Sequence, residues 1–224
     1  MVPDALVRAF HARGIPVGQV YGSSETCPIA SYTRREQALG RVGSAGLPAL
    51  HGELRVVKGN GQEAAPGEVG EIQVRGPQVM REYWNRPDAT REAMADGWFR
   101  SGDLGTRDAD GFLRVVGRAK DVIISGGENI YPPELEMLIA AVPGVAEVAV
   151  AGQDDPQWGE IPVALVIRNR DSDCDADRIL AALEGRVARY KLPRRVLFVQ
   201  DLPRNAMGKV QKFALRKLLE DSRT

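Results

Sequence analysis

The chain has 224 residues, and its 30 Lys and Arg side chains balance 30 Asp and Glu, so the formal net charge is +0. This balance gives no long-range attraction to nucleic acid or to an anionic membrane, and we expect neither as a partner. No apolar run approaches the roughly 18–20 residues of a membrane span. The N-terminus also lacks a signal pattern. The sequence therefore predicts a cytoplasmic protein.

The few cysteines and histidines limit metal and disulfide chemistry. Cys27 and Cys174 are too few for a disulfide scaffold or an all-cysteine zinc site. His11 and His51 are the only histidines, which excludes a His-rich metal site. The sequence assigns no role to any of these four residues.

The first half of the chain predicts a short helix followed by an antiparallel β region. The helix lies within residues 1–10 and ends before Gly14 and Pro16, and residues 17–21 read as a short strand. We expect irregular chain over residues 27–41 and a turn or loop over 43–52. Residues 54–56 and 72–74 alternate apolar and polar side chains, as half-buried strands do. Hairpin signals at 58–61 and 110–111 complete a small antiparallel sheet or barrel over about 52–116.

The second half predicts an α+β module of normal domain size. A short strand at residues 122–125 and a glycine turn precede a helix that starts at Pro132 and stops at Pro143. Strands follow at 145–150 and 161–167, then a helix at 175–187, a strand at 196–199 and a helix at 210–219. We divide the chain into residues 1–117 and 118–224. The predicted fold class is α+β, with the antiparallel barrel or sheet first and the α+β domain second.

Five segments stand out as motifs that could carry chemistry. Tyr21 can stack on a base, and a carboxylate such as Glu25, placed beside phosphates, can hold Mg²⁺. Asp103, in a tight loop, can accept two hydrogen bonds from a ribose diol. Lys209, on a glycine loop, can bring a point charge to a phosphate or carboxylate oxygen. The segments are YGSSET at 21–26, WFRSGDLG at 98–105, GRAKDVIISGGENIYP at 117–132, RYKLP at 189–193 and NAMGKV at 205–210.

Each segment also has an ordinary structural interpretation when taken alone. The first two read as polar turns whose side chains cap their own backbone. The third reads as a solvated linker and turn, the fourth as a helix end, and the fifth as a common Gly-Lys pair. The third segment is far more specific than the others because it is long.

In this order, the five segments resemble the adenylate-forming superfamily. This superfamily includes AMP-forming acyl-CoA synthetases, adenylation domains of peptide synthetases and luciferases. The match runs from about Val17 to the C-terminus. It implies a ligase that joins a carboxylic acid to ATP, giving an acyl-adenylate and pyrophosphate, and then transfers the acyl group to CoA. The implied ligands are ATP or AMP, Mg²⁺, CoA and the acid.

The resemblance also implies roles for individual residues. Around the nucleotide, Tyr21 is similar to the adenine-stacking aromatic, Gly22 lies in the same turn, Ser24 replaces the usual phosphate-contacting Thr, and Glu25 is similar to the Mg²⁺ carboxylate. Asp103 and Arg118 are similar to the ribose contacts, and Arg118 also reaches phosphate. Lys120 matches the inter-domain hinge, and Lys209 matches the catalytic lysine. Gly126, Gly127 and Glu128 match the loop that faces the active site during thioester formation. Trp158 matches a position near the pantetheine path.

One part of the family pattern is absent. The Ser/Thr/Gly-rich phosphate loop ending in Pro-Lys-Gly should lie upstream of Tyr21, and residues 1–20 hold no such run. The resemblance therefore implies the C-terminal portion of a ligase: the end of the large domain with its small barrel, and the whole mobile domain. We expect the isolated chain to be inactive in acyl-adenylate formation. We also expect the apolar faces before Gly52 to drive self-association or to pack on an N-terminal half supplied in trans.

Three functions remain open from the sequence. The first is a free-standing acyl-CoA ligase, which the long third segment and the lack of an attached carrier domain favour. The second is an adenylation domain that loads a carrier protein. The third is a non-catalytic fragment, or one completed in trans. Fatty, aromatic and dicarboxylic acids are all candidate substrates. The segment at 203–209 also resembles the context of lysine acetylation in bacterial acyl-CoA synthetases, which would remove the charge of Lys209.

Overall fold

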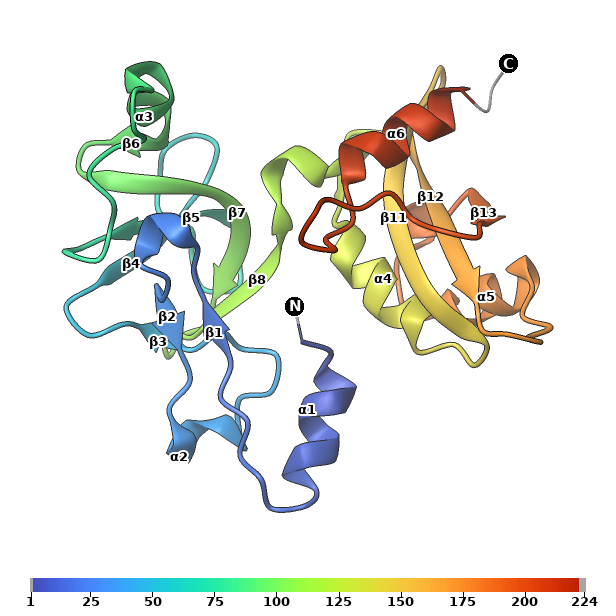
Figure 1. Cartoon of the computed structure of the whole chain (residues 1–224), viewed down its shortest axis with the longest axis horizontal. Helices are drawn as coiled ribbons and strands as arrows, with labels where there is room; N and C mark the ends of the chain where they lie inside the picture. The colour runs from blue at the N-terminus through green and yellow to red at the C-terminus, as the bar shows by residue number, and fades with distance from the viewer. Residues whose placement is uncertain (1, 222–224) are drawn as a thin grey trace. The chain divides into compact units, whose positions relative to one another are not determined.

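The computed structural model describes residues 2–221, and the chain divides into two compact units, one up to Ala119 and one from Lys120. The first unit begins with helix α1 (Asp4–His11) and contains two sheets (Figure 1). A small sheet has the order β1–β2–β3, formed by Val20–Tyr21, Ser31–Tyr32 and Leu47–Pro48. A larger antiparallel sheet has the order β4–β5–β7–β6, with β8 added beside β7; its strands are Glu53–Val57, Gly70–Arg75, Trp98–Arg107, Met94–Ala95 and Leu113–Arg118.

Neighbouring strands of the larger sheet bury apolar side chains in one shared core. Leu54 and Val56 on β4 face the same core as Ile72 and Val74 on β5, and Leu113 on β8 closes it. The expected antiparallel sheet over residues 52–116 is therefore confirmed. The turn at 58–61 closes on residue 63 through a bridge to Val57, rather than leading directly into β5.

Two parts of the first unit differ from expectation. Residues 27–41 are not irregular throughout, because β2 and the short helix α2 (Arg35–Ala38) lie within them. Residues 43–52 include β3, which pairs with β2. Two-residue strands are too short to show a period of two, so the sequence pattern does not predict them. Helix α3 (Pro87–Ala93) was also not expected: it buries none of its side chains and so carries no apolar stripe.

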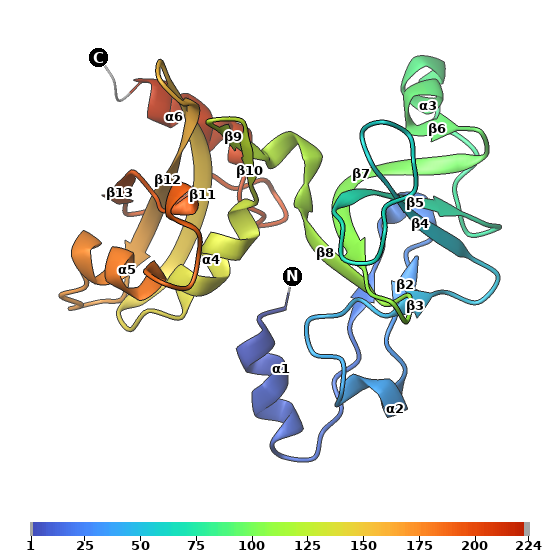
Figure 2. The same cartoon turned by 180° about the vertical axis from the view of Figure 1, so that it is seen from behind.

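The second unit is an α+β layer around one sheet. The sheet has the order β10–β9–β12–β11, with β13 parallel to β12; the strands are Glu128–Ile130, Ile123–Ser125, Gly159–Arg168, Val145–Asp155 and Arg195–Phe198. Helices α4 (Pro132–Ala140) and α5 (Ala176–Leu183) pack on one face, and α6 (Lys212–Asp221) packs on the other (Figure 2). Alternation along β11 and β12 supplies both cores, since Val150 and Val166 face α4 and α5 while Ala151 and Leu165 face α6. The expected fold class is confirmed.

Among residues 2–221, no helix is both long enough and apolar enough to cross a bilayer.

Candidate active site

Tyr21, Asp103 and Arg118 meet in the first unit although they are far apart in sequence. Tyr21 ends β1, Asp103 lies in β7, and Arg118 ends β8, where it pairs across the ladder with Asp103. The Tyr21 hydroxyl donates to Asp103 Oδ2 at 2.9 Å, and Arg118 Nε lies 2.9 Å from Asp103 Oδ1. Both carboxylate oxygens of Asp103 are thus engaged, one by a neutral donor and one by a cation.

The Asp103 carboxylate is well shielded but keeps acceptor capacity. Its side chain is 13% exposed, against 44% for Arg118. A carboxylate offers about four lone-pair sites, so two remain for further donors such as a pair of hydroxyls. Asp103 lies within strand β7 and not in the tight loop expected from the sequence. Ser101 supports this part of the strand, because its Oγ accepts the Asp103 backbone N–H at 3.1 Å and donates to the Ile72 carbonyl at 2.6 Å.

The phenol of Tyr21 is held in its neutral, donating form. Burial raises the pKa of Tyr21 well above its ordinary value near 10, and the negative charge of Asp103 raises it further. Tyr21 therefore acts as a permanent hydrogen-bond donor to Asp103 near neutral pH.

The Gly22 turn carries Ser24 and Glu25 in a single 3₁₀ turn, η1 (Ser24–Thr26). Thr26 is buried and ties the turn together, since its Oγ1 accepts the Ser23 backbone N–H at 2.9 Å. A Cβ on Gly22 would lie 1.7 Å from the Pro28 carbonyl oxygen, so only glycine fits there. Ser24 is exposed, and Glu25 is partly buried.

Glu25 is the charged group of this turn. Its Oε1 accepts a hydrogen bond from the Tyr83 hydroxyl at 2.8 Å. Burial alone would raise the pKa of Glu25, but hydrogen bonds from its own backbone N–H, from Ser23 and from Tyr83, together with positive Arg118, lower it below its ordinary value. Within residues 2–221, no three His, Cys, Asp or Glu side chains gather as a metal site. A lone carboxylate nevertheless fits Mg²⁺, which is commonly held by one or two carboxylates plus phosphates and waters.

In the second unit, Gly126 and Gly127 form the turn between β9 and β10, and Glu128 begins β10. Gly126 donates its N–H to the Trp158 carbonyl at 2.8 Å. Gly126 has φ +60°, and an added Cβ would lie 2.9 Å from Trp158 Cε3, so glycine lets the backbone reach this ring. The structure therefore brings the glycine turn and Trp158 together, with the Arg194 guanidinium 5.6 Å from the ring centre.

Lys209 sits on an exposed loop whose backbone is closely tied. Asn205 Oδ1 accepts the backbone N–H groups of Met207 at 3.0 Å and of Lys209 at 2.9 Å. Arg204 donates to the Gly208 carbonyl at 3.0 Å and pairs with Glu147 on β11. These bonds fix the backbone at Lys209, while the Lys209 side chain is exposed and its ammonium lies in solvent. Lys120 lies in a short 3₁₀ turn, η2 (Ala119–Asp121), at the division between the units.

Sequence reasoning missed Tyr83 and Ser101 as partners of the site. Tyr83 contacts Glu25 across 58 positions of sequence, and no local pattern signals such a contact. Ser101 lies within the WFRSGDLG segment, but only the pairing of β5 with β7 reveals that its hydroxyl links Ile72 to Asp103 by hydrogen bonds.

Comparison with known proteins identifies two family segments in this chain. Residues 1–84 match the AMP-binding enzyme family, and residues 134–209 match the AMP-binding enzyme C-terminal domain. An indoleacetate–CoA ligase from Aromatoleum aromaticum is 51% identical over 219 residues, covering 98% of this chain and 43% of that protein.

Solved structures give the same result. The o-succinylbenzoate CoA synthetase of Bacillus subtilis, in complex with its acyl-adenylate intermediate, matches with a TM-score of 0.91 and 39% identity over 96% of this chain and 44% of that one. The same enzyme in complex with ATP and a magnesium ion matches with a TM-score of 0.89 and 39% identity over 98% and 44% of the two chains. The chain spans less than half the length of the curated relatives that it matches. It belongs to the AMP-binding enzyme family and corresponds to the C-terminal portion of the acyl-CoA synthetases in that family.

Proposed function

We propose that this chain forms part of an AMP-forming acid–CoA ligase, which activates a carboxylic acid with ATP and transfers the acyl group to CoA. The observation that carries the proposal is the Asp103 carboxylate held between the Tyr21 hydroxyl and Arg118, with acceptor sites left for a ribose diol. Membership of the AMP-binding enzyme family supports it. So do relatives named as CoA ligases and a similar structure that contains an acyl-adenylate.

The first unit would bind the nucleotide. Tyr21 would present its ring to adenine, Asp103 would accept both ribose hydroxyls, and Arg118 would lie beside the phosphates. Gly22 keeps the turn free of side chains so that phosphate can approach Ser24 and the backbone. Glu25 would hold Mg²⁺, which when bound neutralises charge on the ATP phosphates.

The second unit would supply the cation for adenylation. Carboxylate attack on the α-phosphorus builds negative charge there, and a lysine ammonium at that place stabilises the transition state more than the ground state. The tied loop would fix the direction of approach of Lys209, and its exposed ammonium lets it serve a ligand rather than a partner within the fold.

Thioester formation would use a different face of the second unit. The CoA thiol would approach along Gly126, Gly127 and Glu128, and Trp158 would lie beside the pantetheine arm. Residues 118–224 would act as the moving domain, with Lys120 as its pivot, and residues 1–117 as the last part of the adenylate-binding domain. Excluding water between the two steps would protect the adenylate from hydrolysis.

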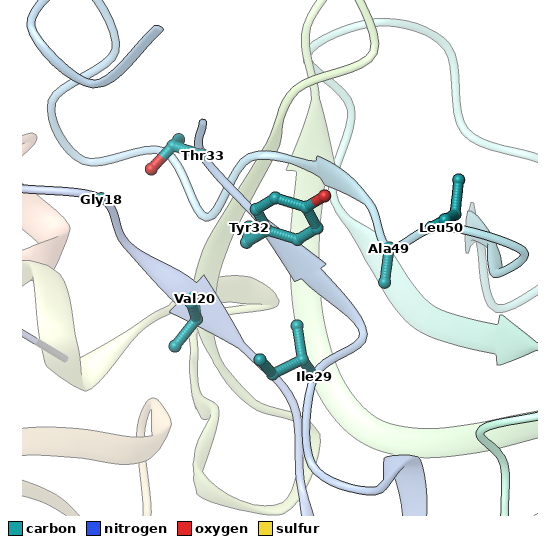
Figure 3. A pocket seen from close by; sticks show the side chains of 7 residues that line it. All are labelled: Gly18, Val20, Ile29, Tyr32, Thr33, Ala49 and Leu50. Carbon is teal, nitrogen blue, oxygen red and sulfur yellow. The ribbon is translucent and has the colours of Figure 1, made fainter. Parts of the chain in front are cut away.

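An apolar hollow in the first unit supports the proposal that a partner covers this surface. It has a volume of about 420 Å³ and lies along β1–β3 (Figure 3). Three apolar side chains that line it are exposed: Val20 is 64% exposed, Ile29 40% and Leu50 77%. We propose that the N-terminal portion of such a ligase packs here, and that the chain alone does not form acyl-adenylate. Without that cover, the same surface favours self-association.

The experiment mixes this chain with the separately purified N-terminal portion of the indoleacetate–CoA ligase and measures AMP release that depends on both acid and CoA. We expect release only in the mixture, and only with Lys209 intact, the control being Lys209→Gln. AMP release that requires a carrier protein instead of CoA would favour the carrier-loading alternative. If the mixture releases no AMP and the chain binds no adenosine, the ligase proposal fails and a non-catalytic role replaces it.

A further inference from the structure

Tyr83 reaches Glu25 from a segment that has no assigned role. The segment lies between β5 and α3 and folds against the η1 turn. Its backbone contributes one contact, since the Met80 N–H donates to the Glu25 carbonyl at 2.8 Å. Its side chain contributes a second, from the Tyr83 hydroxyl to Glu25 Oε1 at 2.8 Å. Glu25 is therefore held at both its main chain and its carboxylate by one stretch of sequence.

Tyr83 is itself fixed from the other side. Its backbone N–H donates to Thr90 Oγ1 at 2.9 Å, and the Thr90 hydroxyl donates to the Arg86 carbonyl at 2.9 Å. The Arg86 N–H in turn donates to the Tyr83 carbonyl at 3.0 Å. This closed set of bonds joins the start of α3 to Tyr83 and fixes the backbone from which the phenol reaches Glu25.

The chemistry of the contact suits a cation ligand. A phenol is a neutral donor, so it orients the carboxylate without cancelling its charge, as an Arg or Lys partner would. The bond engages one oxygen, Oε1, and leaves the negative charge of the carboxylate in place. Groups that orient a ligating carboxylate in this way commonly change metal affinity by about 10–100-fold when removed.

We propose that Tyr83 is a positioning residue that orients the Glu25 carboxylate for the magnesium ion accompanying ATP. The inference rests on the proposed function, because it requires Glu25 to meet Mg²⁺·ATP. It adds α3 and the segment before it to the nucleotide site, through the chain of contacts from Thr90 to Tyr83 to Glu25.

The test measures ATP binding by the 224-residue chain calorimetrically across a series of Mg²⁺ concentrations, with adenosine as the metal-independent probe. Tyr83→Phe keeps the ring and removes the hydroxyl. We expect the Mg²⁺ concentration at half-maximal ATP binding to rise about tenfold, with adenosine affinity unchanged. Thr90→Val should shift the Mg²⁺ response in the same direction by a smaller factor, and Tyr131→Phe in the second unit is the matched control.

Glu25→Gln separates orientation from general stability. It should abolish the Mg²⁺ dependence, and adding Tyr83→Phe to it should change nothing further. If Glu25→Gln removes the Mg²⁺ response but Tyr83→Phe leaves it intact, the positioning role is overturned and the ligase proposal stands. Weaker adenosine binding in Tyr83→Phe would equally overturn it, by showing a structural role. If the parent chain binds neither adenosine nor ATP, the nucleotide site itself is refuted.

Discussion

Replacing Asp103 with Asn tests the contact at the centre of the proposed nucleotide site. Asn keeps the shape of the side chain but loses the negative charge that Tyr21 and Arg118 share. A hydrogen bond to a charged acceptor contributes about 1.5–3 kcal/mol, against about 0.5–1.5 kcal/mol for a neutral one, so the Tyr21 contact loses roughly 1 kcal/mol. Arg118 is 44% exposed, which limits its pair to at most about 1 kcal/mol. We expect Asp103→Asn to lower the free energy of unfolding of the first unit by about 1–2 kcal/mol, measured in urea.

The same substitution should change the alkaline titration of Tyr21. Because the pKa of Tyr21 is raised, there is an alkaline pH range in which the folded state keeps the phenol proton and the unfolded state releases it. The stability that this contributes is complete below pH 10 and falls as the pH rises through the folded pKa. Asp103→Asn removes one cause of the shift, so the Tyr21 pKa should move down toward 10 and the alkaline loss of stability should shrink. Phenolate absorbance, with Tyr21→Phe to identify the signal, measures this.

Two results would refute the reasoning. An unchanged phenol titration in Asp103→Asn would mean that the Tyr21–Asp103 contact is absent in solution. A stable, well-folded Asp103→Asn chain that binds adenosine as tightly as the parent would remove Asp103 from ribose recognition. We expect instead a loss of about 10–100-fold in adenosine affinity, the equivalent of one charge-assisted hydrogen bond.

Three further substitutions test other parts of the molecule. Gly22→Ala places a Cβ 1.7 Å from the Pro28 carbonyl oxygen and should destabilise the first unit by about 3 kcal/mol in urea unfolding, whereas Gly59→Ala, which meets open space, should not. Lys209→Gln should leave stability within about 0.5 kcal/mol because the side chain is exposed, yet slow adenylation in the complemented mixture by about 10²–10³-fold; an undiminished rate would exclude Lys209 from the chemistry. Leu50→Ser should reduce self-association in sedimentation experiments, whereas Leu218→Ser, at an exposed position of α6, should not. Equal effects of the two substitutions would show that the β1–β3 hollow is not the surface that associates.

The sequence was informative where chemistry or periodicity is local. The β4 and β5 pattern predicted the larger sheet because apolar side chains recur at every second position of both strands and share one core. Asp103 was singled out because its segment resembles the adenylate-forming superfamily, and its ribose-binding role stays a prediction. The small sheet could not be predicted, since Ser31 and Tyr32 become a strand only by pairing with β1 and β3 on either side. Tyr83 was missed for the same reason: its partner is 58 positions away, and only the folded chain brings them together.

Among residues 2–221, the hydrophobic clusters do not share buried residues between the two units. The first unit's cluster lies between residues 30 and 113, and the two clusters of the second unit lie between residues 123 and 219. Heating should therefore produce two calorimetric transitions rather than one, and a single melting temperature would not describe the molecule. A cavity in one core, such as Ile72→Ala or Ile139→Ala, should move only its own transition. A chain divided in this way can change the thermal stability of each unit separately.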